Sequence, residues 1–109
     1  ATHAAHPTHI ATTHAAAGTV LPDDLKVMIT DSAHPDAYPI AGFTWLLVYQ
    51  NQPDEAKGRA LVRMLWWAIH DGQAYCESLL YAPLPPEVVT QAEHQIRSIN
   101  YRGTALIVP

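Results

Sequence analysis

The sequence predicts an α/β protein, because two stretches typical of strands are accompanied by three or four stretches of helical character. Residues 43–49 form an unbroken apolar run, and residues 60–69 place apolar side chains along one helical stripe. Pro and Gly residues mark the connections between these segments. With 109 residues, the chain is long enough for one domain at most.

The N-terminal part predicts one helix and one strand. A helix is expected over residues 8–17, with Pro7 near its start and Gly18 past its end. Residues 25–30 alternate loosely between apolar and polar types, which predicts a strand. Residues 31–36 are expected to form a loop.

The middle of the sequence predicts an extended, irregular segment followed by a central strand. Residues 37–42 contain Pro39 and Gly42 and are expected to be extended and irregular. Residues 43–49 are rich in β-branched and aromatic types. Because this run is apolar on both faces, it should lie in a sheet that is covered on both sides.

The C-terminal half predicts three helices and an extended tail. The first helix spans residues 54–70, with Pro53 at its start, Asp54 and Glu55 near its positive end, and Gly72 after its last turn. Its stripe should form a core with the preceding strand, made of Leu61, Leu65, Trp66, Ile69, Trp45 and Leu47. Shorter helices are expected over residues 72–80 and 86–99, and residues 101–109 should be extended.

Composition limits the functions that the chain can have. Net charge is −4 and the six basic residues are dispersed, so no nucleic-acid partner is expected. The single Cys76 excludes an internal disulfide and a Cys-based metal site. No apolar run reaches the roughly 18 residues of a membrane helix. The first residues lack the pattern of a signal peptide, so an export signal would have to lie upstream.

These elements do not make a self-sufficient sheet. Two strands alone are marginally stable and cannot cover helices this apolar. Charged residues make up only 15% of the chain, below the roughly 25% of an average soluble domain. The sequence therefore predicts one part of a larger α/β protein, whose faces are covered by something else.

The order of several motifs resembles the C-terminal region of the periplasmic phosphate-binding proteins (PstS family). The matching stretches are "LPDDLKVMITDS", "AYPIAGFTWLLVYQ" and "AKGRALVRMLWWAIHDGQAYCESLLYAPLPPEVV", and they run from about residue 20 to residue 99. Members of this family are the substrate-receiving components of phosphate ABC importers. The resemblance implies a two-lobed type II periplasmic-binding-protein fold, of which this chain would supply a hinge strand, a central strand and three helices.

The resemblance also implies a division of the chain. Residues 1–36 would be a remnant of the second lobe, residues 37–42 the hinge crossover, and residues 43–109 the C-terminal part of the first lobe. Within the crossover, Tyr38, Pro39 and Ile40 would form the hinge. A hinge at this place would explain why the Pro-containing segment at residues 37–42 directly precedes the most apolar strand. The strands beside that strand would come from the N-terminal part of such a receptor.

The implied function is binding of inorganic phosphate, without enzymatic activity or cofactor, in the periplasm or at the cell surface. The membrane subunits of the ABC importer would be partners. Family ligand groups are helix N-termini, Ser and Thr hydroxyls, one Arg and one Asp, and none of these motifs maps onto this chain. Arg59 and Arg63 are interpreted as the solvated face of a helix, and residues 42–44 lie near the family's cleft without matching a ligand motif.

Four early histidines, His3, His6, His9 and His14, raise the question of a metal site. His6 and His9 are the candidates, since an i, i+3 pair shares a helix face and imidazole binds Zn, Ni or Cu. No carboxylate or thiol lies within the first 22 residues, so surface histidines are the favoured interpretation. No catalytic arrangement is predicted, because nothing organises a nucleophile with a base.

Three hypotheses remain open from the sequence. The chain is a fragment or one half of a split receptor, which binds phosphate only with the missing N-terminal portion. Alternatively, it is a small module derived from that family that associates with itself or with another protein. The third hypothesis is a His-based metal-binding protein.

Overall fold

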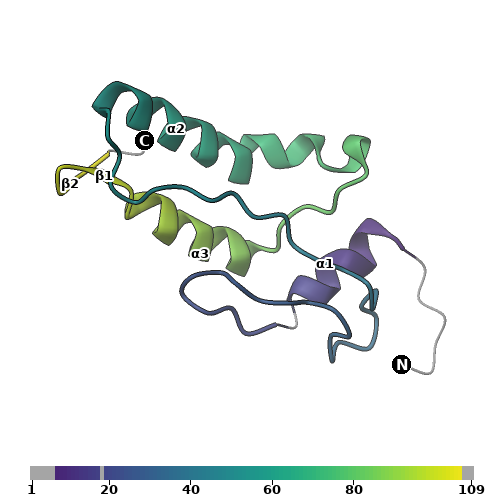
Figure 1. Cartoon of the computed structure of the whole chain (residues 1–109). Coiled ribbons are helices and arrows are strands. Elements are labelled where there is room, and N and C mark those ends of the chain that lie inside the picture. Colours follow the sequence, from purple (N-terminus) through teal and green to yellow (C-terminus); the bar gives the residue numbers. More distant parts are fainter. Residues whose placement is uncertain (1–6, 18, 107–109) are drawn as a thin grey trace.

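The computed structural model describes residues 7–17 and 19–106. In chain order its helices are α1 (His9–Ala17), α2 (Glu55–Ile69), the 3-10 helices η1 (Asp71–Tyr75) and η2 (Glu77–Leu79), and α3 (Pro86–Arg97). The strands β1 (Asn100–Tyr101) and β2 (Thr104–Ala105) follow (Figure 1). Helices with a small sheet are consistent with the predicted α/β class. Within the described ranges, every helix is too short or too polar to span a lipid bilayer.

Helix α2 begins close to where the sequence predicts it. Asp54 is the N-cap residue, and its Oδ1 accepts a hydrogen bond from the backbone N–H of Lys57 at 2.9 Å. Gly58 faces the buried Leu106 near the C-terminus. A Cβ at position 58 would be only 2.6 Å from Cδ1 of Leu106, which is too close. The glycine therefore permits the close approach of Leu106 to the helix backbone.

The helix predicted over residues 72–80 is not a single α-helix. It is divided into η1 and η2, and Leu80 ends η2 with a left-handed backbone (φ 62°). Neither element buries a residue, so packing does not offset the cost of nucleating a short helix. Helix α3, in contrast, begins at Pro86 in the first helical position, as predicted.

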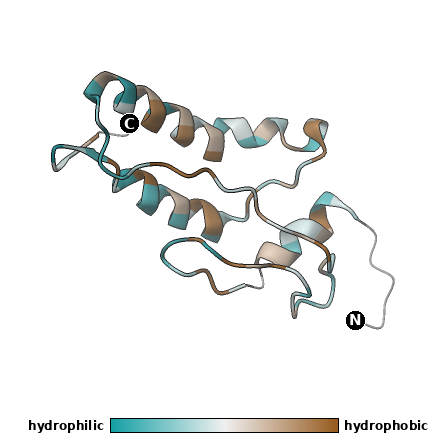
Figure 2. Ribbon diagram, viewed as in Figure 1, coloured by the Kyte–Doolittle hydropathy of each residue, from teal (hydrophilic) through white to brown (hydrophobic). Residues whose placement is uncertain are grey.

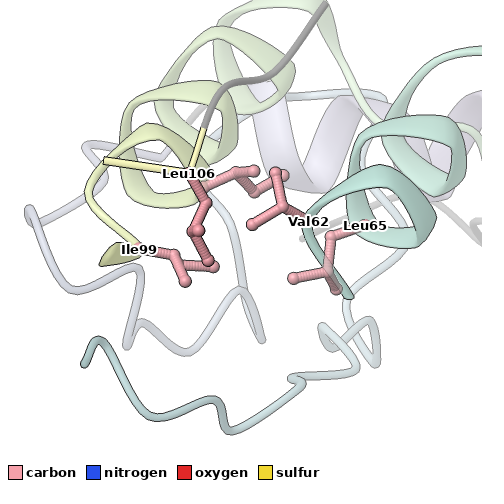
Figure 3. Close-up of a cluster of buried hydrophobic side chains, with 5 residues drawn as sticks. Val62, Leu65, Ile99 and Leu106 are labelled. Atoms are coloured by element: carbon pink, nitrogen blue, oxygen red, sulfur yellow. The ribbon is translucent and has the colours of Figure 1, made fainter. Parts of the chain in front are cut away.

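The larger hydrophobic core lies between α2, α3 and the chain end. Its buried residues are Val62, Leu65, Ile96, Ile99 and Leu106 (Figure 3). Leu61, Trp66 and Ile69 are partly buried and pack against it, as the stripe of α2 predicts. Helices α2 and α3 lie side by side and run in opposite directions (Figure 1).

A second, smaller core lies beside α1. Its buried members are Ala15, Ala16, Ile29, Ala37 and Ala41, with Val27 and Phe43 packed against them. Residues 25–30 show the predicted alternation, since Ile29 is buried while Met28 and Thr30 are exposed. The prediction of a strand is nevertheless wrong, because these residues pair with no strand among the described residues and form a loop that begins with a left-handed backbone at Leu25 (φ 59°).

The predicted central strand, residues 43–49, is also not a strand in this structure. It is extended, but its backbone forms no hydrogen bond with the backbone of any other described residue. Pairing begins only after it, where Asn51 forms a parallel bridge with Asn100. The expected core positions Trp45 and Leu47 are 44% and 92% exposed. A strand requires a partner, and the described chain supplies none along this stretch.

The chain end forms a tight hairpin. Strands β1 and β2 are antiparallel, with Tyr101 opposite Thr104. Arg102 and Gly103 connect them with φ values of 50° and 81°, the signs of a type I′ turn. The prediction of an extended tail over residues 101–109 is therefore wrong for residues 101–105, which turn back on themselves, and residues 107–109 lie outside the described residues.

The whole molecule is elongated. Its radius of gyration is 15.7 Å, whereas about 13 Å is expected for a compact domain of this length. Polar contacts connect the two cores: the Gln91 amide donates to the carbonyls of Leu21 and Pro22, and the Gln95 amide donates to that of Asp23. Two small cores joined in this way leave much apolar surface uncovered.

Candidate functional site

An apolar groove lies beside residues 43–48. It has a volume of about 450 Å³ and lies between this stretch, α2, α3 and residues 21–26. Its apolar lining includes Phe43, Leu46, Val48, Leu65, Val88 and Ile96. Figure 2 shows the hydrophobic, brown stretch passing alongside the two helices. The groove is therefore suited to apolar side chains and not to a charged ligand.

The same stretch exposes several apolar side chains. Leu46, Leu47 and Tyr49 are 66%, 92% and 83% exposed. Trp45 is held in place by a hydrogen bond of 3.1 Å from its indole N–H to the carbonyl of Leu25. An extended, apolar segment with free backbone donors and acceptors is a template on which another strand can pair.

The predicted hinge residues lie in a turn. The backbone N–H of Tyr38 donates to the carbonyl of Ala11 at 2.9 Å, and the carbonyl of Pro39 accepts from the backbone N–H of Asp31 at 2.9 Å. Ile40 is 76% exposed. Pro39 and Ile40 thus form a turn instead of an extended crossover. Their role as a hinge stays a prediction.

The two arginines of α2 lie on its solvated face, as predicted. Arg59 forms an ion pair with Glu55 one turn earlier, with Nη2 2.7 Å from Oε1. Arg63 is exposed and lines a shallow hollow beside Trp66 and Trp67. No charged or polar side chain in the described part of the chain is buried. This arrangement provides no enclosed site for an anion among the described residues.

Two loops are held in place by side-chain hydrogen bonds. Residues 81–85 connect η2 to α3, and the Gln73 side chain anchors them by accepting from the backbone N–H of Leu84 at 2.8 Å. The Ser32 hydroxyl accepts from the backbone N–H of His34 at 3.4 Å and so caps a loop.

A polar pair connects α2 to α3. His70 Nδ1 lies 2.8 Å from the carbonyl oxygen of Trp66, and Nε2 lies 2.9 Å from Oε1 of Glu93. Both partners are acceptors, so both ring nitrogens must carry protons for both hydrogen bonds to form. The bond to Trp66, followed by that to Glu93, raises the pKa of His70 above its usual 6.5. Burial opposes this shift, and Asp71 adds to it.

Glu93→Gln should therefore change the pH dependence of stability. Because the folded-state pKa of His70 is raised, the stabilisation is complete below about pH 6.5 and is lost as the pH rises through the folded-state pKa. At about pH 6 we expect Glu93→Gln to lower the free energy of unfolding by about 0.5 kcal/mol, with a smaller difference at pH 9.

Urea unfolding from pH 5 to 9 measures this effect, with Glu87→Gln on the exposed face of the same helix as the matched control. The His70 ring signal in NMR should titrate at lower pH in Glu93→Gln. Parallel stability curves for the variant and the wild type would contradict the assignment.

The early histidines are only partly described. His6 lies outside the described residues, and His9 is half-buried at the start of α1. Within the described ranges, three potential metal ligands come together at a different place, formed by His14, His34 and Asp36. His14 belongs to α1, whereas the other two belong to the loop at residues 31–36. Sequence reasoning missed this group because its two parts are 20 positions apart in the chain.

Comparison with known proteins gives one consistent result. The chain is 31% identical over 70 residues to the protein named "Phosphate-binding protein PstS" of Xylella fastidiosa strain 9a5c. The protein of the same name from strain Temecula1 shows the same identity over the same length. In each case the match covers 64% of this chain and 19% of the relative. No family model matches the chain. The relatives are named as binding proteins, and the chain spans about a fifth of their length.

Proposed function

We propose that this chain is the C-terminal part of a phosphate-binding receptor of an ABC-type importer, and that it holds inorganic phosphate only together with the rest of such a receptor. Residues 43–106 would complete the first lobe, residues 37–42 would form the crossover, and the part before residue 37 would belong to the second lobe. The receptor would act in the periplasm or at the cell surface. This chain would have a binding role and not a catalytic one.

The observation that carries the proposal is the uncovered apolar stretch beside an apolar groove. Residues 43–49 have the composition of a central strand but no pairing partner among the described residues. In a complete receptor, strands on either side would use these backbone groups and cover Leu46 and Leu47. The similarity of 70 residues to two phosphate-binding proteins supports this class of receptor.

The charge distribution supports the need for the remaining, N-terminal part of the receptor, which we call the complement. A phosphate dianion needs several charge-assisted hydrogen bonds to offset the loss of its hydration. Arg59 already pairs with Glu55, and Arg63 lies on an exposed helix face beside Asp71. The net charge of −4 adds a weak repulsion at long range. The donors for the anion would therefore come from the remaining part of the receptor.

Calorimetric titration with phosphate at low salt tests the proposal. The isolated chain should bind phosphate with a Kd weaker than about 1 mM, which corresponds to about −4 kcal/mol. Refolding it with the N-terminal portion of a homologous phosphate-binding protein should restore micromolar or tighter binding. Arg59→Ala and Arg63→Ala should leave the restored affinity within about twofold, because neither side chain is expected to contact the anion.

The opposite results are equally informative. Micromolar binding by the isolated chain would contradict the need for a complement and direct attention to Arg63. A stable homo-oligomer that does not combine with the complement would favour the small interaction module instead. Sedimentation of the chain, with and without the complement, distinguishes these outcomes.

A further inference from the structure

We propose that His14, His34 and Asp36 form a binding site for a divalent transition-metal ion of the zinc type. One potential ligand atom from each of these three residues lies within 4.8 Å of the other two. The site connects the last turn of α1 to the loop at residues 31–36, beside the smaller of the two cores. This inference is independent of phosphate binding.

The first observation is an unsatisfied nitrogen. His14 Nδ1 is buried and has no hydrogen-bond partner. A buried polar atom without a partner is costly in a folded protein and requires an explanation. His34 lies directly beside it, with ring centroids 4.5 Å apart at an interplanar angle of 32°. A metal ion between the side chains would give this nitrogen its missing partner.

The second observation is that backbone hydrogen bonds hold the loop in place. Tyr38 donates to the carbonyl of Ala11 on α1 at 2.9 Å, and Ala37 donates to that of His34 at 3.1 Å. These bonds fix the loop against the helix turn that precedes His14. Both imidazoles and the carboxylate therefore come from backbone segments whose relative position is fixed, which reduces the ordering needed on binding.

The donor set indicates which ions would bind. Two neutral imidazoles and one carboxylate are ligands that Zn²⁺ accepts, with a water molecule in the remaining position. Tetrahedral coordination with bonds of about 2.1 Å places ligand atoms about 3.4 Å apart. The three atoms lie within 4.8 Å of one another and would have to move closer together by up to about 1.4 Å. Side-chain rotation in an exposed Asp36 and a half-buried His34 allows this.

Binding would replace one weak contact. His34 Nδ1 accepts a hydrogen bond of 3.2 Å from the backbone N–H of Asp36. A metal at Nδ1 displaces this bond, and a metal at Nε2 requires the ring proton to move to Nδ1. Either change removes one long hydrogen bond, whose free energy is small compared with that of a metal–imidazole bond.

The composition of the smaller core explains what the ion would contribute. Four of its five buried residues are alanines, which provide little apolar area for stability. A metal that binds the folded form and not the unfolded form stabilises the folded form in proportion to its affinity. We therefore expect the ion to stabilise the packing of α1 against the loop at residues 31–36.

Titration of the full chain with Zn²⁺ at pH 7.5 tests the site. We expect one ion to bind with a micromolar or tighter Kd and to raise Tm, and a chelator to reverse both effects. His14→Ala and His34→Ala should each weaken binding on the order of 100-fold, and the exposed Asp36→Asn about tenfold. Four-coordinate Co²⁺ in the same site should show the intense visible absorption of a non-octahedral complex.

Matched controls separate this site from the other histidines. The combined replacement of His3, His6 and His9 by alanine, and His94→Ala on α3, should leave the affinity within about twofold. Loss of binding in the combined variant, or unchanged binding in His34→Ala and Asp36→Asn with helicity retained, would overturn the proposal. Millimolar or weaker binding by the wild type would overturn it as well.

Discussion

Replacing Leu65 by alanine is expected to lower the free energy of unfolding by about 2 to 5 kcal/mol. Leu65 is 8% exposed on α2 and belongs to the larger core with Val62 and Ile96. The substitution leaves a cavity among side chains from α2, α3 and the chain end, three segments that all depend on this core. Few other substitutions in the chain should have so large an effect.

Met64→Ala is the matched control. Met64 is adjacent on the same helix but 51% exposed, and alanine is a good helix former. We expect its effect to be within about 0.5 kcal/mol. Urea unfolding followed by far-UV circular dichroism measures both variants. Similar effects of the two substitutions would show that α2 packs through a different face.

The sequence predicted helices better than strands, for a physical reason. Helix α2 forms its hydrogen bonds within itself, and its cap at Asp54 and its apolar stripe are local signals that do not depend on a partner. Helix α3 is similar, with Pro86 marking its start. The short segment from Gly72 onward is helical as expected, but it forms two 3-10 helices instead of one α-helix, because neither half buries a side chain.

The two expected strands failed because pairing is not a local property. Residues 25–30 retain the alternation of buried and exposed side chains, and residues 43–49 retain an extended backbone. What they lack is a neighbouring strand. Composition therefore indicated correctly the extended backbone of residues 43–49, and the order of motifs indicated the similarity to phosphate-binding proteins. Strand pairing also needs a second segment, which the composition of one stretch does not specify.

The group formed by His14, His34 and Asp36 shows the other limit of sequence reasoning. Spacing within one helix directed attention to His6 and His9, since residues three positions apart share a face. The observed group instead depends on how a loop folds back onto α1, through contacts such as that between Tyr38 and Ala11. A histidine and an aspartate two positions apart in a loop were the only local signal.

Replacing Leu47 by serine is expected to weaken association with the rest of a receptor while leaving the stability of the isolated chain almost unchanged. Leu47 is 92% exposed, so its loss should change the free energy of unfolding of the isolated chain by less than about 0.5 kcal/mol. If the rest of a receptor covers this stretch, the same substitution removes the burial of a leucine, about 1.5 to 3 kcal/mol. Association with the complement should then weaken by about 10- to 150-fold.

Val20→Ser provides the matched control, because Val20 is also 92% exposed but does not line the groove beside residues 43–48. Its effect on association should be less than about twofold. Titration of each fluorescently labelled variant with the N-terminal portion of a homologous receptor measures the difference. Equal affinities for Leu47→Ser and Val20→Ser would show that residues 43–49 are not covered on assembly. Unfolding of the isolated chain by Leu47→Ser would show that this side chain already belongs to its core. The expected pattern, intact folding with weakened association, would identify this stretch as the surface through which the chain is completed.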